Sequence, residues 1–552
     1  MSRSPRHLAS APVETEWQFD AIDVRPVERW LAGARDHVGP SVQEGELSTI
    51  VDTYLDTEDW RLYRAGYSLR VRRKHGTAEA TLKSLAESRD GLRQRDEYTE
   101  PLNGRDVSAL VRAAGPVSTR AKLAAGRRPL IPLFSVRTRR QEYRLAMEGD
   151  SAGEIAVDRT TIALGNGAES ARLRRVEVEV PEPMVPTLAP FVDSMRTASG
   201  LHPATLSKYE AGLLARGFQP GATLDFGSRA IDPSMTTGEV AFAVLRRHFA
   251  SMLVHEPGSR MGDDPEELHD MRVATRRLRA ALKLFAAELP VRMARFHDEL
   301  GWVAAALGAV RDLDVQLEQL DVWTKELEPQ DAAALRALRA TLEDEYRTAR
   351  EEMLATLDSP RYDRLVASMA AALRRGPLRT SRASRAPVLA TAPDFVLNRY
   401  RAVRKAARRI GPSASPRDYH RLRIRAKRLR YALEFLQDVY PEEIPPVVRR
   451  LIELQNLLGA HQDADVAVRR LRSTAAERGS ALPPDTVLAM GIITQRYLDE
   501  AAELRRRFPS VNGRLSGRSW RTVKKAMNRR RPEPATPTRT ATPSLVPSEL
   551  GA

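Results

Sequence analysis

Apolar and polar residues alternate in short runs between about residues 13 and 215, which is the period of a β-strand. Turn residues separate the runs, so the pattern predicts an antiparallel β domain with a few helices. The runs are TYLDT, YSLRVRR, AEATLKSL, DEYTEPL, EYRLAME, EIAVDRTTI and RRVEVEVP. Their polar positions are mostly charged, whereas an ordinary sheet turns such positions to water. We therefore consider that these charges face inward.

The period changes beyond a Gly-, Pro- and Ser-rich segment at 216–236, which we interpret as a linker. From 237 to 508 apolar residues recur at intervals of three and four, as in VVRRLIELQNLLG, and this spacing predicts a domain of long helices. The first 12 residues and the basic, Pro- and Thr-rich tail at 509–552 are predicted to be disordered.

The helical region contains an internal repeat. HDMRVATRRLR at 269–279 returns as HRLRIRAKRLR at 420–430, and LGAVRDLDV returns as LGAHQDADV at the same offset of 151 residues. Two motifs that share one offset predict two similar helical bundles related by a pseudo-two-fold axis, at about 237–373 and 394–508.

Composition narrows the classes of function. The 552 residues include no cysteine, which excludes disulfides, thiolate nucleophiles and cysteine zinc sites and favours oxygen-bound cations. A net charge of +16 favours a polyanionic partner. No run of apolar residues is long enough for a membrane span or a secretory signal, so we expect a cytoplasmic protein without a membrane partner.

Each copy of the repeat places four basic residues on one helical face, opposite an apolar face. They are His269, Arg272, Arg276 and Arg279 in the first copy and His420, Arg423, Lys427 and Arg430 in the second. Like charges at this spacing repel one another, so either acidic neighbours or a bound polyanion must offset them. Asp312, Asp314, Asp463 and Asp465 are the acidic candidates. Few aromatic residues lie near the stripe, which disfavours nucleic acid, although DNA contacted through phosphates alone stays open.

With these motifs, the region from about 237 to 508 resembles the CHAD domain, a module of two pseudo-symmetric four-helix bundles. The resemblance implies that both basic stripes face one cavity that binds inorganic polyphosphate. It counts His269 and His420 among the signature residues and assigns them no catalytic role.

Charged residues repeat at period two on several of the predicted strands, so that members of a pair face the same way. The set comprises Glu14, Glu16, Arg70, Arg72, Lys83, Arg95, Glu97, Arg137, Arg139, Asp158, Glu177, Glu179 and Lys208. A closed barrel with a charged lumen would use such a set, with carboxylates for a divalent cation and basic groups for phosphates. A polar outer face with cross-strand ion pairs is the alternative.

The region from about 13 to 215 resembles the CYTH domain, the family of triphosphate tunnel metalloenzymes, on the motifs ETEWQ, YSLRVRR, TLK, GLRQRDEY, DRTTI, VEVEV and SKYE. The resemblance implies an eight-stranded antiparallel tunnel that binds a triphosphate through Arg70, Arg72, Lys83, Arg95, Arg139 and Lys208. It implies that Glu14, Glu16, Lys83 and Arg95 are catalytic, and that Mg²⁺ or Mn²⁺ is held by Glu14, Glu16, Glu97, Asp158, Glu177 and Glu179.

Two positions depart from the CYTH pattern. Gln18 stands where the first motif has a lysine, and Thr99 stands where a further carboxylate could follow Glu97. The leading hypothesis is a metal-dependent hydrolase of inorganic triphosphate joined to a polyphosphate-binding domain, which could associate with polyphosphate granules. A non-catalytic polyphosphate-binding protein, favoured by Gln18, is the alternative, followed by an adenylyl cyclase. The oligomeric state stays open.

Overall fold

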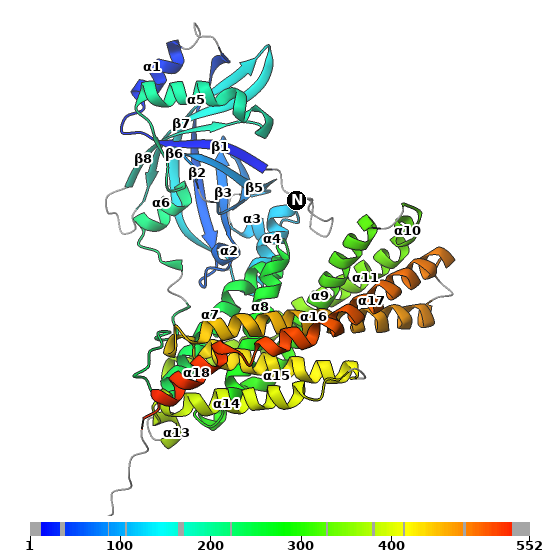
Figure 1. The fold of residues 1–552 in the computed structure, drawn as a ribbon. Helices are drawn as coiled ribbons and strands as arrows, with labels where there is room; N and C mark the ends of the chain where they lie inside the picture. The colour runs from blue at the N-terminus through cyan, green and yellow to red at the C-terminus, as the bar shows by residue number, and fades with distance from the viewer. Residues whose placement is uncertain are drawn as a thin grey trace, which may run out of the picture.

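The computed structural model describes residues 13–33, 39–86, 88–104, 107–163, 171–220, 224–326, 329–377, 381–411, 414–478 and 482–532. It contains a β-barrel domain followed by a helical domain (Figure 1). The expectation of disorder at residues 1–12 falls outside the described residues. None of the helices in the described ranges is long and apolar enough to cross a membrane.

The first domain is a closed antiparallel barrel of eight strands. In spatial order β5, β4, β3, β2, β6, β7, β8 and β1 pair with their neighbours, and β1 closes the ring by pairing with β5. The strands are β1 (Val13–Asp20), β2 (Ser41–Asp56), β3 (Tyr67–Lys74), β4 (Thr77–Ser84), β5 (Leu92–Pro101), β6 (Ile131–Met147), β7 (Asp150–Ile162) and β8 (Ala171–Glu179). A two-residue strand, β9 (His202–Pro203), extends the sheet beside β1.

The barrel is apolar outside and charged inside, because its strands alternate the two kinds of residue. Val176 and Val178 on β8 are fully buried beneath the outer helices, while Glu177 between them lines the lumen. The outer layer consists of α1 (Arg25–Gly33) and α5 (Val185–Ser199) on one side and of α3 (Val107–Arg112) and α4 (Pro116–Ala125) on the other. The inward-facing charges expected from the strand pattern are thus present.

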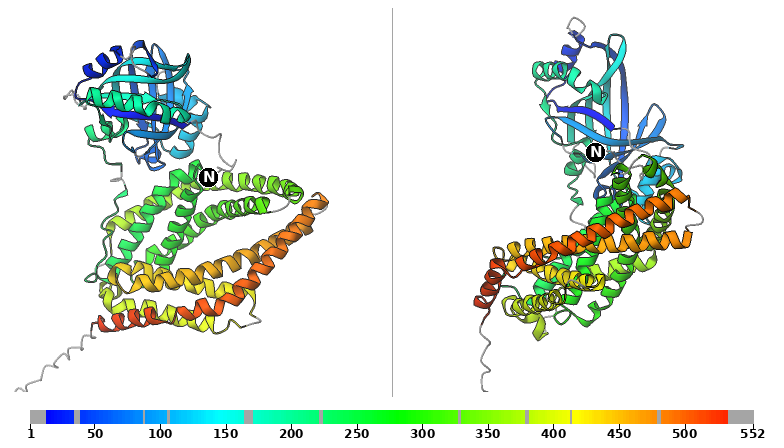
Figure 2. Two further views of the ribbon diagram at one scale, coloured as in Figure 1. Left: turned by 45° about the horizontal axis from the view of Figure 1, so that its top comes forward. Right: turned by 45° about the vertical axis from the view of Figure 1, so that its right-hand side comes forward.

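The helical domain consists of two repeats whose main helices the offset of 151 residues relates. The first repeat has α7 (Thr237–Met261), α8 (Pro265–Leu284), α9 (Arg295–Glu326), α10 (Pro329–Ala334), α11 (Arg336–Leu357) and α12 (Pro360–Arg375). The second repeat has α14 (Val388–Ala407), α15 (Pro416–Phe435), α16 (Ile444–Arg478), α17 (Pro484–Arg514) and α18 (Arg518–Arg529), preceded by the short α13 (Arg382–Arg385). Figure 2 shows the repeats as two arms joined at one end.

The second repeat extends further in both directions than the sequence predicts. It begins at Val388 rather than at about 394, and α17 and α18 occupy positions up to Arg529 in the segment predicted as a disordered tail. That prediction is wrong for 509–529, because Trp520, Val523 and Met527 are buried against the helical core. The Pro- and Thr-rich residues from 533 onward fall outside the described residues.

The two domains are joined by more than the linker at 216–236. Within that segment, Leu224 and Phe226 pack into the core of the helical domain, and the rings of Phe226 and Phe249 lie 4.9 Å apart. In addition, α4 and the short helix α2 (Arg61–Arg64), which follows β2, pack against α7. This end of the barrel therefore rests on the first helical repeat.

Candidate functional site: a charged tunnel and a basic cleft

A cavity of about 480 Å³ runs inside the barrel. Eight carboxylates and seven basic groups line it, together with Gln18 and a few small or aromatic residues. The carboxylates are Glu14, Glu16, Glu79, Glu97, Glu154, Glu177, Glu179 and Glu210, and the basic groups are Arg70, Arg72, Lys83, Arg93, Arg95, Arg140 and Lys208. Such a lining can bind a multiply charged anion and a cation together.

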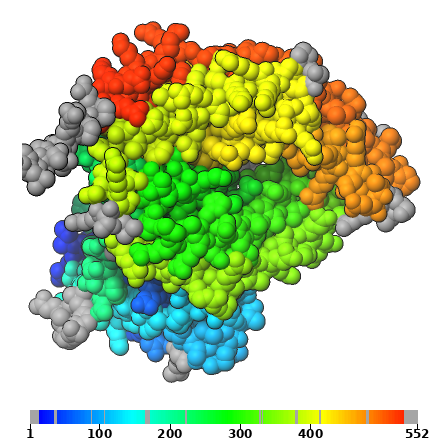
Figure 3. Space-filling view, turned by 90° about the horizontal axis from the view of Figure 1, so that it is seen from below, coloured from blue at the N-terminus to red at the C-terminus, as the bar shows by residue number. Residues whose placement is uncertain are grey.

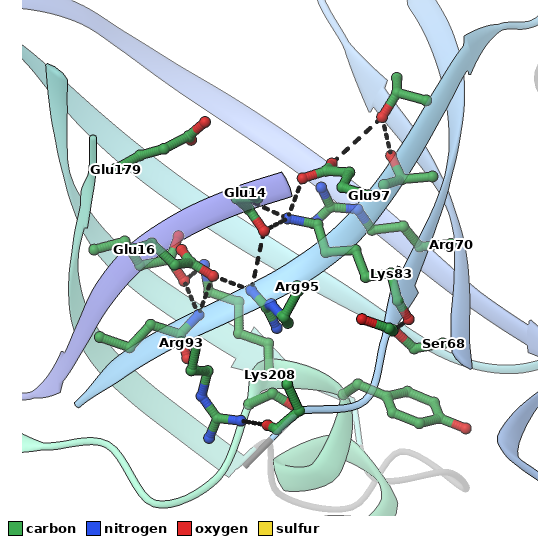
Figure 4. A pocket seen from close by; sticks show the side chains of 18 of the residues that line it. Glu14, Glu16, Ser68, Arg70, Lys83, Arg93, Arg95, Glu97, Glu179 and Lys208 are labelled. Atoms are coloured by element: carbon green, nitrogen blue, oxygen red, sulfur yellow. Dashed lines mark hydrogen bonds and ion pairs between the residues drawn. The ribbon is translucent and has the colours of Figure 1, made fainter. Parts of the chain in front are cut away.

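At one side of the tunnel, β1, β4 and β5 bring together the residues expected to be catalytic (Figure 4). The Lys83 Nζ donates to Glu14 Oε1 at 2.7 Å and lies 3.0 Å from Glu97 Oε2. Arg95 binds Glu16 and lies 3.3 Å from Glu14. Lys83 and Arg70 lower the pKa of Glu97 to about 2 although burial acts in the opposite direction. Glu97 is therefore ionised at neutral pH.

The opposite side of the tunnel carries a more deeply buried network. Lys208, at the start of α6 (Lys208–Ala215), binds both Asp158 and Glu177, the latter at 2.9 Å. Arg140 on β6 binds the same two carboxylates, with its Nε 2.9 Å from Asp158 Oδ1. Asp158 is completely buried and is not among the residues that line the cavity. It supports Arg140 and Lys208 from behind, so the expectation that it binds a metal is not met.

Of the expected phosphate-binding residues, Arg139 alone is misplaced. Arg70, Arg72, Lys83, Arg95 and Lys208 all line the tunnel, whereas Arg139 is exposed on the outside of the barrel and Arg140 takes the inward position. Arg137 has the same parity as Arg139 and is also exposed. Because side chains alternate strictly along a strand, an error of one residue places a side chain on the opposite face.

Several tunnel residues were not identified from the sequence. Arg93 and Glu154 both line the cavity, and Asp52 supports it from β2, where it accepts hydrogen bonds from Arg72 at 2.9 and 3.0 Å. Arg93 has the parity of Arg95 in GLRQRDEY, and this parity could have identified it. Asp52 lies in VDTYLD, where apolar neighbours gave no sign that the carboxylate faces a pair of arginines.

Gln18, the departure from the CYTH pattern, lies buried between two carboxylates. Its Nε2 donates to Glu16 Oε1 at 2.9 Å and more weakly to Glu177 Oε1 at 3.5 Å. The side-chain amide oxygen, Oε1, has no hydrogen-bond partner among the described residues. An amide can donate to both carboxylates but adds no charge, so the positive charge on this wall comes from Arg95, Arg140 and Lys208. Thr99, the other departure, binds Glu97 and Thr81 at 3.3 Å each.

The carboxylates offer a donor set that suits a hard divalent cation. Burial and the neighbouring Glu14, Glu97 and Glu154 raise the pKa of Glu179, and within the described ranges its side chain makes no ion pair. A cation bound there would relieve this repulsion. In the described part of the chain, no three acidic or imidazole groups already stand in ligand geometry. Glu14, Glu16, Glu97 and Glu179 thus fit a metal by charge and donor type. Lys83 and Arg95 pair with the first three, as Arg140 and Lys208 pair with Glu177, so a bound ion would compete with these cations.

In the helical domain, the two basic stripes face each other where α8 packs against α15. Burial and repulsion from Arg423 and Arg276 lower the pKa of Lys427 to about 7. Burial also lowers the pKa of Arg272, and repulsion from Arg423 contributes to this shift. The Arg276 Nε donates to the Tyr431 hydroxyl, in the other repeat, at 2.6 Å. Figure 3 shows a hollow between the first repeat (green) and the second (yellow to orange). We call this region the cleft.

The remaining stripe residues lie along the same cleft and have few acidic partners. Arg279 donates to the His297 carbonyl, Arg430 pairs with Glu434 at 3.3 Å, and His420 contacts Gln462 at 2.8 Å. His269 is half-buried. The expected acidic neighbours offset part of this charge. Asp312 pairs with Arg272 at 3.2 Å and Asp463 interacts with Arg423 and Lys427, whereas Asp465 pairs with Arg469, outside the stripe.

A glycine on the neighbouring helix stands beside one arginine of each stripe, where a Cβ would make an ordinary van der Waals contact. A Cβ at Gly308 would stand 3.6 Å from Arg272, and one at Gly459 would stand 3.7 Å from Arg423. These two glycines are also 151 residues apart. The pseudo-symmetry therefore extends to the packing around each stripe.

Comparisons with known proteins match both domains. The CYTH domain model matches residues 36–212, and the CHAD domain model matches residues 243–472. The comparison with curated proteins gives no match.

Solved structures match one domain each. The CHAD domain from the plant Ricinus communis is 29% identical over 52% of this chain and 95% of its own, with a TM-score of 0.45. PptA from Streptomyces chartreusis is 20% identical over 50% of this chain and 99% of its own, with a TM-score of 0.42.

A third solved structure matches the first domain. HpAC1 from Hippeastrum, described as a candidate adenylyl cyclase with a dominant triphosphatase activity, is 17% identical over 37% of this chain and 97% of its own, with a TM-score of 0.30. With the closed eight-stranded barrel and the repeated helical domain, the family matches show that this chain consists of a CYTH domain followed by a CHAD domain.

Proposed function

We propose that the tunnel hydrolyses inorganic triphosphate with the help of Mg²⁺ or Mn²⁺, and that the cleft of the CHAD domain binds inorganic polyphosphate. The observation that carries the first proposal is the meeting of seven basic groups and eight carboxylates in one cavity of about 480 Å³. CYTH domains are metal-dependent, and members of the family are triphosphatases or cyclases. The two aromatic residues of the lining, Tyr54 and Tyr209, pack against each other with ring centroids 5.3 Å apart, so we assign no site for a nucleoside base and prefer inorganic triphosphate.

In this proposal the basic groups bind the phosphate chain and stabilise the charge that develops on it. Arg70, Arg95 and Arg140 present guanidinium groups from three strands, and Lys83 and Lys208 contribute ammonium groups from opposite sides. Arginine forks match phosphate oxygens in bidentate fashion. In the free protein these cations bind carboxylates, so the substrate would have to displace part of those ion pairs.

The acidic side of the tunnel would bind the metal and activate water. Glu14, Glu16, Glu97 and Glu179 are the proposed ligands, and the bound ion would neutralise charge on the phosphate oxygens. A carboxylate of the tunnel that does not coordinate the ion would orient the attacking water and accept its proton. The water oxygen would bond to the terminal phosphorus as the phosphoanhydride bond breaks, releasing diphosphate and phosphate.

The test is phosphate release from inorganic triphosphate, ATP and long-chain polyphosphate, with Mg²⁺, with Mn²⁺ and with neither. We expect release from inorganic triphosphate that depends on the metal and stops when a chelator is added. Phosphate release that continues after a chelator is added would contradict the proposed metal dependence. Formation of cyclic AMP from ATP would favour a cyclase. Absence of release with any metal would instead support a tunnel that only binds its ligand.

A Gln18→Lys variant accompanies this assay. An ammonium group between Glu16 and Glu177 would add positive charge to the tunnel wall, so we expect faster hydrolysis than in the unchanged protein. Gln18→Met, which removes the amide without adding charge, is the matched control. Equal rates for all three proteins would show that the missing lysine does not limit the reaction.

Polyphosphate binding by the cleft is supported by the abnormal acidity of Lys427. Its pKa of about 7 reflects burial and the surrounding arginines. When a polyanion binds, the Lys427 amine would take up a proton and regain its positive charge. Affinity for polyphosphate should therefore fall as pH rises above 7, by at most about tenfold per pH unit for one proton. Titration calorimetry at several pH values measures this dependence.

Lys427→Arg should abolish most of this pH dependence, since a guanidinium remains charged throughout the range. Lys524→Arg, at an exposed position on α18, is the matched control and should leave the dependence unchanged. If the affinity of the Lys427→Arg protein varies with pH as strongly as that of the unchanged protein, Lys427 is not the titrating group.

A further inference from the structure

The two helical repeats use equivalent faces in different ways. The C-terminal half of α7 and the turn after it, which contains Asp263, contact the barrel domain. Arg64 donates to the Leu253 carbonyl, Arg61 lies 3.1 Å from Glu256, and Tyr67 donates to Asp263 at 3.2 Å. The equivalent half of α14 and the start of α15 carry no domain, and Figure 3 shows these helices (yellow) uncovered.

The residues at equivalent positions differ in charge. In the first repeat, Ala250, Pro257 and Gly258 are buried, Ala250 within the helical core and Gly258 against Glu267 of α8. At an offset of 151 residues they become Arg401, Arg408 and Arg409, all of them exposed. The acidic Glu266 and Asp270 of α8 likewise become Arg417 and Arg421 of α15.

The carboxylates that receive the barrel's polar groups have no counterpart in the second repeat. Glu256 and Asp263, which bind Arg61 and Tyr67, correspond to Ala407 and Ala414. A second barrel domain with the same basic docking residues would therefore meet repulsion at this face. A ligand of this face would be recognised by complementary, negative charge.

We define the outer basic surface by eight residues on α14 and α15 or directly after α14. They are Arg401, Lys405, Arg408, Arg409, Arg417, Arg421, Arg425 and Arg428. The two helices contribute to one patch, since Arg409 and Arg421 both act on Asp418, and burial together with Arg428 lowers the pKa of Arg399 on α14. Asp418, which pairs with Arg421 at 3.3 Å, is the acidic residue within it.

The outer basic surface and the cleft share helix α15. On a helical wheel, Arg423, Lys427 and Arg430 lie within about 60° of one another, and Arg417, Arg421, Arg425 and Arg428 form a second stripe roughly 80° or more away. A helix with its side chains is only about 10–12 Å across, so an anion that leaves the cleft reaches the second stripe by passing around α15. In the first repeat, Glu266 and Asp270 would repel such an anion.

We propose that the outer basic surface is a second binding surface for the same polyphosphate chain, which it holds outside the cleft. This inference rests on the proposed binding of polyphosphate by the cleft. Binding at two linked surfaces would make affinity rise with chain length, because the second contact forms within one complex. Arginine accounts for seven of the eight residues, and its fork suits phosphate. Exposed aromatic residues for stacking bases are absent from these eight positions.

The test uses the full chain and a quadruple variant, Arg417→Gln, Arg421→Gln, Arg425→Gln and Arg428→Gln. The matched control is Arg292→Gln, Arg295→Gln, Arg364→Gln and Arg375→Gln, which removes the same charge from the first repeat, away from the cleft. A third protein, with Arg272→Gln, Arg423→Gln and Lys427→Gln, removes the charge of the cleft. Binding of polyphosphate of several chain lengths is measured against salt concentration, and triphosphate hydrolysis reports an intact tunnel.

For long chains, we expect the outer variant to bind more weakly than the control. Its salt dependence should be shallower by about one unit of slope for each phosphate group that the surface no longer neutralises. For chains that fill only the cleft, we expect the outer variant and the control to bind alike. The cleft variant should lose binding of the short chains and should bind long chains more weakly than the control, through the outer basic surface alone.

Three results would count against these proposals in distinguishable ways. Equal long-chain affinity of the outer variant and the control would overturn the second surface while leaving the cleft in place. If the unchanged protein binds no polyphosphate, the function proposed for the cleft fails, and this inference fails with it. Should double-stranded DNA displace long-chain polyphosphate at equal phosphate concentration, in a manner that depends on the outer residues, the surface belongs to nucleic acid.

Discussion

Replacing Arg140 by glutamine is expected to lower kcat/KM for inorganic triphosphate by about 10²-fold or more, the usual cost of removing one preorganised donor from a charged site. Arg140 lines the tunnel and is fixed there by Asp158 and Glu177. Arg139, its neighbour in sequence, is exposed on the outside of the barrel. Arg139→Gln should therefore leave kcat/KM within about twofold, since such surface changes are nearly neutral.

The two variants each remove one positive charge from β6, Arg140→Gln from the inner face and Arg139→Gln from the outer face, so they differ only in the face that is changed. Steady-state rates are measured on protein whose folding is verified by circular dichroism, since Arg140→Gln also disturbs a buried network. Arg140→Lys, which retains the charge, should recover part of the rate and so separate charge from shape. A larger rate decrease in Arg139→Gln than in Arg140→Gln would show that β6 is shifted by one residue in the functional protein.

This pair of residues also shows what a strand pattern can predict. In VEVEV on β8, apolar and acidic residues alternate, so the parity places Glu177 and Glu179 on one face, and the structure shows that this face lines the lumen. In RTRR on β6, arginines occur at both parities, and the sequence does not distinguish the inward from the outward one. Thr138 and Thr160, which meet at 3.0 Å across β6 and β7, fix the register, and this contact is tertiary.

The helical domain was predictable to the extent that its repeat is visible in sequence. The offset of 151 residues predicts the pairing of α8 with α15 and hence two opposed basic stripes. The apolar spacing of Trp520, Val523 and Met527 indicates a helix, but the surrounding arginines and the Pro-rich tail hid it. The residues that carry the second repeat beyond 508 would have been found by extending the offset to α12.

The interface between the domains was not predictable, because its residues are dispersed along the chain and form no recognisable sequence motif. Arg61 and Arg64 lie in a short helix between two strands, and Glu256 lies in the C-terminal half of α7. A buried acid within a helix is indistinguishable in sequence from one on a solvated face. The structure alone shows that Glu256 is 1% exposed and faces guanidinium groups from both domains.

Glu256→Gln should lower the free energy of unfolding by about 3 kcal/mol, since removing one partner of a buried ion pair leaves the opposite charges uncompensated. The Glu256 carboxylate lies 3.1 Å from Arg61 and 2.9 Å from Arg260, and it accepts a hydrogen bond from the Tyr362 hydroxyl at 2.9 Å. Glutamine preserves the shape but not the charge. Glu351→Gln, at an exposed position on α11, is the matched control and should change stability by less than about 0.5 kcal/mol.

Two measurements distinguish the consequences of this change. Denaturant unfolding reports the loss of stability, and proteolysis of the linker at 216–236 reports the separation of the two domains. Because Glu256 joins α2 to α7, the variant should expose the linker to protease before either domain unfolds. If linker cleavage and unfolding remain as in the Glu351→Gln control, the ion pairs do not hold the domains together.

Acidification should produce the same separation in the unchanged protein. Although burial acts in the opposite direction, Arg61 and Arg260 lower the pKa of Glu256 below its usual value of 4.5. The ion pairs therefore stabilise the folded state above that usual value, and their contribution disappears as pH falls through the lower pKa of the folded protein. Glu256→Gln should remove this part of the acid dependence, so that linker cleavage in the variant is already fast at neutral pH and changes little on acidification.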